Sequence, residues 1–326
     1  MRRRKRPAAA QALLGVGTAL CVLIAAEAGL RLAGFNAAYR VEDIGSWRFA
    51  PNLHDFESRG PRDLHSFRVT TNADGLRTPL PRTKTPGVRR ICVMGDSTVF
   101  GWGVDDGGSV AEGAMTALPT SFEVLNAGQP GYSSTMAAWL YGVVVADYTP
   151  DLTILFLPMH DTNRVLVSDR EVLGASNGPI ADMRVTIARE SRIYSLLRGW
   201  LYEGADRPWL LPDDATSEPH VPRVSDAERT ADLESMVAWA ASWGGTVEVG
   251  YLAFKQDIEG PGGERPTEAW AKAWSADHHT PLVDLRGCCT GQAGLVLADQ
   301  PGHLTHEGNA AVGKALADVI LAQAGP

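Results

Sequence analysis

Short apolar runs alternate with helical patterns along most of this chain. Five runs have the length and composition of buried strands, at residues 91–94, 123–125, 152–157, 247–253 and 282–283. Strands that alternate with helices in this way form a mostly parallel sheet with helices on both faces. The pattern therefore predicts an α/β domain with a mostly parallel five-stranded sheet, whose functional residues lie beyond the carboxyl ends of the strands.

Helical spacing of apolar residues fills the connections between those strands. It is clearest at residues 134–148, 225–243 and 305–324. Ser225 and Thr305 begin two of these stretches, and hydroxyl side chains at such positions accept hydrogen bonds from the free amides of a first helical turn. We therefore expect both residues to be N-caps.

One connection, residues 165–224, is much longer than the others. It contains an amphipathic helical pattern around residues 191–202, followed by a proline-rich loop. Long loops in compact domains are often functional, so this segment is either surface decoration or a cap over a functional site.

The segment before the first predicted strand, residues 36–89, is rich in Pro, Asn, Asp and Arg. One alternating stretch, residues 67–70, runs into a turn at residues 72–75. We expect an irregular lead-in that contains a β-hairpin.

The N-terminal segment has the pattern of a membrane anchor. Basic residues at 2–6 precede an uncharged run of 20 residues at 7–26, and a helix of that length covers about 30 Å, the thickness of the hydrocarbon core of a bilayer. The positive-inside bias predicts a cytoplasmic tip and an exported domain. A cleaved signal peptide is the alternative, because Ala26, Glu27 and Ala28 resemble a cleavage site, although the run exceeds the usual apolar length of about 7–15 residues.

Charge is distributed unevenly between these parts. The net charge is −8, but the first 35 residues hold six basic side chains and one acidic side chain, and the remainder holds 24 basic and 37 acidic ones. Such an acidic surface repels phosphate backbones, so we expect no nucleic-acid partner. The four cysteines lack the paired spacing of a metal site and no nucleotide-binding motif is present, so we expect no metal and no cofactor.

Polar residues that could carry chemistry follow the predicted strands or precede the last helix. Ser97 stands at a strand end where a helix should begin, and the glycine-rich turn after the second strand can present amide N–H groups to an anion. Val99 occupies the place of the second glycine of a nucleophile elbow, which excludes the α/β-hydrolase arrangement. In chain order the polar blocks are Gly95-Asp96-Ser97, residues 126–133, His160-Asp161 and Asp299 to His303.

Taken together, these blocks resemble the SGNH-hydrolase superfamily, the GDSL-type lipases and esterases. Four ordered blocks are far more specific than any one of them, and the match covers residues 90–324. Residues 67–77 and 27–32 also resemble the lead-in and the anchor end of the membrane-attached bacterial branch of this family. The matching residues are Gly95-Asp96-Ser97, Asn126 through Gly131, the turn at His160-Asp161, and His303 with Leu304, Thr305 and Gly308.

The resemblance implies a flavodoxin-like three-layer α/β/α sandwich. The chain would then divide into a cytoplasmic tip and transmembrane anchor at 1–35, the lead-in at 36–89 and a catalytic domain at 90–326.

The resemblance also implies roles for individual residues. Ser97 would be the nucleophile and His303 its general base, oriented by Asp299. The backbone N–H groups of Ser97 and Gly131 would stabilise the oxyanion, and His160 would be a further donor.

Two positions depart from the family pattern. His160 stands where the family has an asparagine donor; a neutral imidazole offers one N–H in its place, and the alternative is a histidine that is simply packed or solvated. The family carboxylate lies three residues before the histidine, where this chain has Gln300, so Asp299 is shifted by one residue. Glu307 and Asp284 are the alternative partners of the histidine.

The sequence therefore predicts an anchored serine esterase that hydrolyses a carboxylic ester, with a short acyl group on an envelope glycan or lipid as the expected substrate. An O-acyltransferase would use the same acyl-enzyme. A catalytically silent binding module with the same fold is the third hypothesis, and the departures at His160 and Asp299 are its support.

Overall fold

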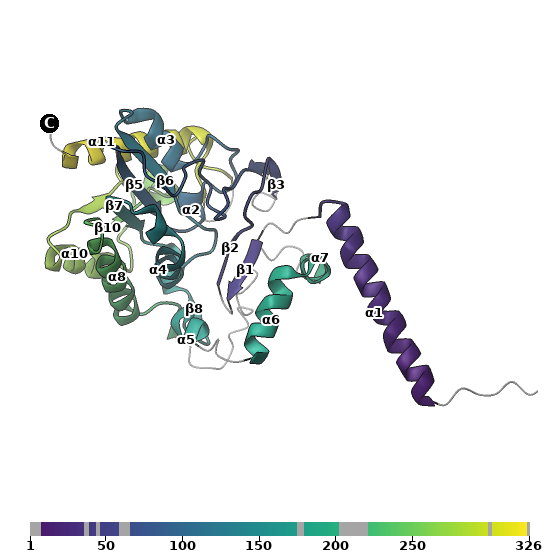
Figure 1. Ribbon diagram of the computed structural model, residues 1–326. Coiled ribbons are helices and arrows are strands. Elements are labelled where there is room, and N and C mark those ends of the chain that lie inside the picture. The colour runs from purple at the N-terminus through teal and green to yellow at the C-terminus, as the bar shows by residue number, and fades with distance from the viewer. Residues whose placement is uncertain are drawn as a thin grey trace, which may run out of the picture.

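A five-stranded parallel sheet forms the centre of the computed structural model, which describes residues 8–35, 39–43, 46–58, 66–174, 179–201, 221–298 and 302–324 (Figure 1). Every neighbouring pair of strands is parallel, and their chain order corresponds to the 2-1-3-4-5 arrangement of flavodoxin-like folds. The structure confirms the predicted α/β class and the five strands. Across the sheet these are β11 (Leu282–Asp284), β10 (Thr246–Tyr251), β7 (Leu152–Phe156), β5 (Arg89–Met94) and β6 (Phe122–Asn126).

Helices cover both faces of this sheet, which makes the domain a three-layer sandwich. One face carries α3 (Val110–Ala117) and α11 (His306–Ala324), and the other carries α4 (Ser134–Val143), α8 (Asp226–Ala241) and α10 (Glu268–Asp277). Short helices lie at the strand ends and in the connections. These are α2 (Ser97–Phe100), α9 (Lys255–Ile258) and the 3-10 turns η1 (Val145–Tyr148) and η2 (Met159–Thr162).

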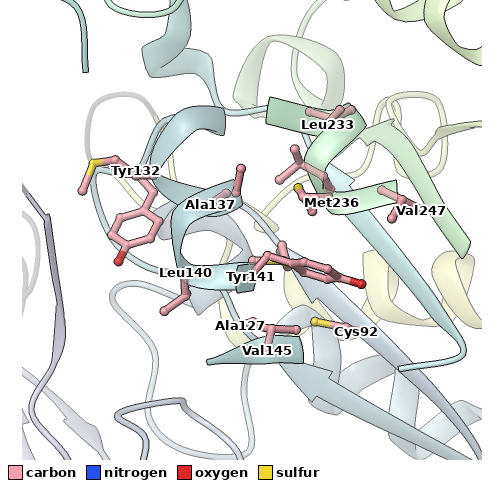
Figure 2. Close-up of a cluster of buried hydrophobic side chains, with 14 of the residues drawn as sticks. Cys92, Ala127, Tyr132, Ala137, Leu140, Tyr141, Val145, Leu233, Met236 and Val247 are labelled. Carbon is pink, nitrogen blue, oxygen red and sulfur yellow. The ribbon is translucent and has the colours of Figure 1, made fainter. Parts of the chain in front are cut away.

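The alternation of side chains along the strands produces these layers. Ile91 and Val93 of β5 join the buried cluster under α3 and α11, whereas Cys92 and Met94 join the cluster under α4 and α8. Figure 2 shows the second cluster, where Tyr141 of α4 lies over the sheet beside Cys92.

The predicted N-caps are confirmed. The hydroxyl of Ser225 accepts a hydrogen bond from the Glu228 amide at 3.3 Å, and that of Thr305 accepts one from the Gly308 amide at 3.1 Å. The predicted helix at 134–148 is interrupted instead, because α4 ends at Val143 and a 3-10 turn follows.

The lead-in contains two hairpins. β3 (Phe56–Ser58) pairs with β4 (Phe67–Val69), so the predicted strand at 67–70 pairs with an earlier segment and not across the turn at 72–75. β1 (Tyr39–Asp43) pairs with β2 (Ser46–Phe49), which the sequence did not indicate. The ring of Phe49 stacks on Phe100 with centroids 4.5 Å apart. The lead-in therefore packs against the end of α2, the short helix that begins with Ser97.

The long connection after β7 forms a separate group of elements. Its ends pair as the antiparallel strands β8 (Arg164–Val165) and β9 (Val221–Pro222), so it leaves and rejoins the domain at one place. We call the residues between these strands the insertion. It contains α5 (Asp169–Gly174), α6 (Pro179–Glu190) and α7 (Arg192–Leu201).

The insertion lies toward the N-terminal part of the chain. Helix α5 packs against α4, α6 against β1, and α7 against α1 (Ala8–Leu32), so α6 and α7 lie between the sheet domain and α1 (Figure 1). Residues 202–220, which hold the predicted proline-rich loop, lie outside the described residues. The cap over the site stays a prediction.

Helix α1 is the element predicted to be a membrane anchor. It contains one span, Gln11–Leu32, that is long and apolar enough to cross a membrane, and none of that span is buried within the protein.

Candidate active site

The turn after β5 places Ser97 at the carboxyl end of a central strand. Gly95 has φ +157°, and a Cβ atom there would lie 2.6 Å from Val99 Cγ2 and 3.0 Å from the Phe156 carbonyl oxygen, so this turn requires glycine. Asp96 then caps α2, since its Oδ1 accepts hydrogen bonds from the amide and hydroxyl of Thr98 at 3.0 and 2.7 Å. Ser97 is the first residue of that helix.

His303 reaches the same edge of the sheet from the loop before α11. Its carbonyl oxygen accepts a hydrogen bond from the Leu297 amide at 2.7 Å, beside an antiparallel bridge between Val296 and Leu304. The bridge fixes the backbone on which the imidazole is carried.

Ser97 Oγ lies 2.8 Å from His303 Nε2, although 206 positions separate the two residues. Both are buried, with 9% and 7% of their surfaces exposed. If the hydroxyl donates to Nε2, the imidazole is neutral and carries its hydrogen on Nδ1. This is the arrangement in which a histidine can take the proton of an attacking serine.

Two amides near this contact have no acceptor in the part of the chain that the structure describes. The N–H of Ser97 is the first of α2, and the N–H of Gly131 lies in the turn after β6; neither donates to a described protein group. Gly131 has φ +77°, a conformation that favours glycine. Both amides are therefore available to an oxygen of a ligand.

His160 lies in η2, directly after β7, and is partly buried. Its Nδ1 lies 3.4 Å from Nδ2 of Asn163. The sequence did not single out Asn163, because it falls just outside the third polar block, His160-Asp161.

Asp299, the predicted carboxylate partner of His303, lies outside the described residues. Of the two alternatives, Asp284 is bound by Arg286, with Oδ2 2.6 Å from Nη2, and Glu307 is exposed in the first turn of α11. The Arg286 guanidinium lowers the pKa of the Asp284 carboxyl.

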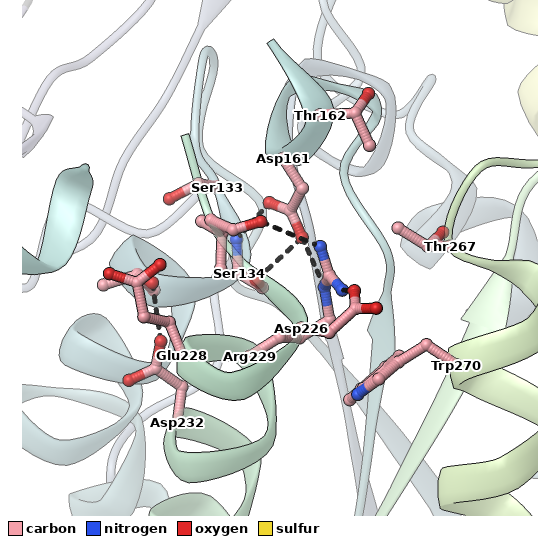
Figure 3. Close-up of polar contacts among 12 residues, drawn as sticks. Ser133, Ser134, Asp161, Thr162, Asp226, Glu228, Arg229, Asp232, Thr267 and Trp270 are labelled. Carbon is pink, nitrogen blue, oxygen red and sulfur yellow. Dashed lines mark hydrogen bonds and ion pairs between the residues drawn. The ribbon is translucent and has the colours of Figure 1, made fainter. Parts of the chain in front are cut away.

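A buried ion pair holds the segment that carries His160. Asp161 is fully buried and accepts hydrogen bonds from Arg229 Nε at 2.9 Å and from the amide and hydroxyl of Ser134 at 2.8 and 2.7 Å (Figure 3). The Arg229 guanidinium lies 4.9 Å from the ring centre of Trp270. Burial raises the pKa of the Asp161 carboxyl, and the bonds from Arg229 and Ser134 oppose that shift. Asp161 thus joins η2 to the first turns of α4 and α8.

Arg223 joins the insertion to the turn after β6. It is 2% exposed, and its Nη1 donates to the Gly131 carbonyl oxygen at 2.7 Å while its Nε donates to Asp169 at 2.8 Å. No pattern in the sequence marks Arg223 or Arg229 as buried, because a buried arginine has the same local pattern as an exposed one. Only their partners, which come from distant segments, reveal the difference.

The lead-in also contacts this turn. The Gln129 side chain accepts from the Phe49 amide at 3.0 Å and donates to the Gly75 carbonyl at 3.3 Å, and the Tyr132 hydroxyl donates to the carbonyl of Trp47. Segments on both sides therefore support the backbone around Gly131.

The described residues contain no group of three or more His, Cys, Asp or Glu side chains that could hold a metal ion.

No protein-family model matches this sequence, and no curated protein matches it significantly. Solved structures do match. One is a lipolytic protein of the G-D-S-L family from Desulfitobacterium hafniense, 14% identical, covering 71% of this chain and 98% of its own at a TM-score of 0.43. An inhibitor-bound aryl esterase from M. smegmatis is 14% identical, covering 72% of this chain and 98% of its own at a TM-score of 0.40.

A third match is the acetyl xylan esterase AlAXEase, 13% identical, covering 71% of this chain and 100% of its own at a TM-score of 0.44. By their descriptions these are lipolytic proteins and esterases, the class that the sequence blocks predict.

Proposed function

We propose that this protein is a serine esterase that hydrolyses a carboxylic ester through an acyl-enzyme on Ser97. The observation that carries the proposal is the 2.8 Å contact between Ser97 Oγ and His303 Nε2, in a buried place at the carboxyl edge of the sheet. Nucleophile and base within hydrogen-bond reach are the signature of this chemistry.

The reaction would proceed in two halves. Ser97 Oγ attacks the ester carbonyl while His303 Nε2 takes its proton, and the tetrahedral intermediate collapses as the imidazolium protonates the departing alkoxide. Water then attacks the acyl-enzyme, His303 accepts a proton from that water and returns it to Ser97 Oγ, and the carboxylic acid leaves. Asp299 is our proposed partner for Nδ1–H of His303.

The oxyanion would be held by the free amides of Ser97 and Gly131. Arg223 supports the second of these, because its bond to the Gly131 carbonyl restrains the turn. Such preorganised donors stabilise charge that develops only in the transition state, and loss of one costs about 10²- to 10³-fold in kcat.

His160 is our proposed third donor to the oxyanion. A contact of 3.4 Å from Asn163 Nδ2 to His160 Nδ1 favours the tautomer that carries hydrogen on Nε2, which makes Nε2–H the donor of this ring. His160→Asn would then keep or raise the rate of ester hydrolysis, and His160→Ala would lower it. Equal rates for His160→Ala and the unaltered protein would remove His160 from the site.

We further propose that α1 is a retained single-pass anchor, with the basic tip in the cytoplasm and the catalytic domain outside. Glu27 and Arg31 of α1 contact α6 and α7, and cleavage after Ala28 would remove Glu27 from that contact. The substrate would then be an ester of the cell envelope, with a short acyl group on a glycan or a lipid.

The test is hydrolysis of p-nitrophenyl acetate by the full chain in detergent. Ser97→Ala should lower kcat by about 10⁴- to 10⁶-fold. Ser275→Ala is the matched control, because its buried hydroxyl has no partner among the described residues and its loss should leave the rate unchanged. Equal rates for Ser97→Ala and the unaltered protein would end the proposal. Product analysis with a glycan acceptor present would detect transfer to a sugar hydroxyl in place of water.

A further inference from the structure

Two charged side chains near the end of α1 hold the corner between α6 and α7. Glu27 accepts hydrogen bonds from the amides of Arg192 and Ile193 at 3.0 and 3.1 Å and from the Ser191 hydroxyl at 3.2 Å. These amides are the first of α7, which has no carbonyl of its own to offer them. A negative charge at this end also complements the helix dipole. Glu27 is thus the cap of a helix more than 160 positions away.

Arg31, one turn further along α1, holds the other side of the same corner. Its Nη2 donates to the carbonyl oxygen of Glu190, the last residue of α6, at 2.6 Å, and its Nε donates to Glu27 at 2.9 Å. The terminal carbonyls of a helix favour a cation. The corner is therefore attached to α1 by an anion, Glu27, at the start of α7 and by a cation, Arg31, at the end of α6.

The position of Glu27 along α1 determines how far the corner between α6 and α7 lies from the centre of a bilayer that α1 spans. The uncharged run that ends just before Glu27, residues 7–26, has 20 residues, which at about 1.5 Å each cover close to 30 Å, the thickness of the hydrocarbon core. The large apolar side chains of this run are all exposed, as expected of a helix that faces lipid. They are Leu13, Leu14, Val16, Leu20, Val22, Leu23 and Ile24. Glu27 then falls at the outer boundary of the bilayer.

Helix α7, which begins next to Glu27, has exposed apolar side chains at this boundary. Leu196 and Leu197 are 44% and 50% exposed, and Tyr194 is 38% exposed. In Figure 1 α7 is seen nearly end-on beside the end of α1, which runs across the picture, so the two helices cross. A helix that crosses a spanning helix at the boundary of the bilayer, with apolar side chains exposed, has the geometry of an interfacial helix.

We propose that α7 lies in the outer interface of the bilayer that α1 spans, with Tyr194, Leu196 and Leu197 in contact with lipid. The partner of this surface is the phospholipid bilayer. The insertion would then rest on the membrane, and Arg223, which binds Asp169 of the insertion, would connect it to the turn of Gly131. The inference rests on α1 being in the membrane and is independent of the chemistry of Ser97.

The test is photocrosslinking of the full chain in vesicles made of equal parts of phosphatidylcholine and phosphatidylglycerol with a radiolabelled tracer lipid. Benzoylphenylalanine replaces Leu197 on α7, Leu20 on α1 or, as the matched control, Leu321. Leu321 is an exposed leucine of α11, which lies on the far side of the sheet domain from α1 (Figure 1). Lipid labelling should be several-fold higher at positions 20 and 197 than at 321.

Two results would overturn the proposal. Labelling at 197 no higher than at 321 would show that α7 does not touch lipid, and absence of labelling at 20 would show that α1 is not in the bilayer. Glu27→Ala should lower labelling at 197 and leave it unchanged at 20, because α7 loses its cap. Glu190→Ala is the control, since Arg31 binds only the backbone of that residue. Equal labelling at 197 in Glu27→Ala and in Glu190→Ala would contradict the role of Glu27. Ester hydrolysis in the same vesicles reports on Ser97 separately.

Discussion

Two contacts in this protein join segments that are far apart in the sequence, and they are supported differently. Ser97 meets His303 across 206 positions, and Glu27 meets Ser191 across 164. The first contact lies between buried side chains at the edge of a sheet packed on both faces. The second is a set of hydrogen bonds at the end of α1, with Leu196 and Leu197 of α7 exposed beside it.

The difference indicates what each contact needs. The sheet and its two buried clusters fix the backbone on either side of the serine and histidine, so that contact forms within the protein itself. The corner at Glu27 has polar bonds that define its geometry but leaves apolar surface open to the surroundings. Covering such surface with an apolar partner is favourable, and in our account that partner is lipid.

The largest effect should come from breaking the first contact. His303→Gln removes the general base, and kcat for an ester should fall by about 10⁴-fold or more, since serine and base act as a unit. His278→Gln is the control, because His278, the residue that follows α10, pairs with Glu234 of α8 at 3.0 Å and its loss should not affect the rate. A rate for His303→Gln close to that of the unaltered protein would show that His303 is not the base.

The next largest effect should be on the unfolding free energy, when the buried ion pair between Arg229 and Asp161 is broken. Arg229→Met leaves the buried Asp161 without its cation, which costs about 3–5 kcal/mol of unfolding free energy in such pairs. Asp226→Asn is the matched control, because this second partner of Arg229 is 73% exposed and its loss should cost less than about 1 kcal/mol. Urea denaturation measures both. Equal losses for the two variants would mean that burial of Asp161 does not determine the effect.

Breaking the second contact, between Glu27 and the start of α7, should destabilise only the helices next to it. Glu27→Ala removes the cap of α7, and loss of a cap costs about 0.5–2 kcal/mol, or roughly 2- to 30-fold in a local opening equilibrium. Hydrogen exchange of the full chain should therefore speed up in α6 and α7 and stay unchanged in α4 and α8. Faster exchange throughout the domain would show that the corner is part of the core's stability.

The smallest expected effect is a pH dependence of the unfolding free energy, and it comes from Glu268 in the sheet domain. Bonds from Arg286 and then Lys272 lower the pKa of Glu268 from 4.5 to about 2. The folded state therefore holds this proton less tightly than the unfolded state, so the stabilisation is complete above about pH 4.5 and is lost as the pH falls toward 2. Glu268→Gln should differ from the unaltered protein in unfolding free energy mainly above pH 4.5. A difference that does not change between pH 6 and pH 2.5 would contradict this assignment.

Much of the fold was predictable because the spacing of apolar residues along the sequence indicates which side of a strand or helix is buried. The strand and helix patterns placed all five strands of the sheet, and Ser225 and Thr305 marked the starts of two helices. The order of the strands was implied only by the family resemblance, since periodicity says nothing about neighbours. The hairpin of β1 and β2 was missed, because Trp47 and Phe49 are isolated apolar residues in a polar segment whose burial depends on partners such as Gln129.

The candidate site was predictable where its residues follow a strand of the sheet or precede the last helix. Ser97 and His303 meet as the order of the blocks implied, whereas Arg223 and Arg229 could not be found from the sequence. Their burial is decided by the Gly131 carbonyl and by Asp161, which the fold brings to them. The contact of Glu27 with α7 was likewise hidden, because a glutamate after an apolar run has the same pattern whether it faces water or caps another helix.

The most direct test of the central claim is labelling of the full chain with a fluorophosphonate, followed by mass spectrometry of its peptides. Only a serine activated by a neighbouring base reacts quickly with such a reagent. Our account predicts a single phosphonyl adduct on the peptide that contains Ser97, and loss of that adduct in His303→Gln. Absence of an adduct on the unaltered protein, or an adduct on another serine, would contradict it.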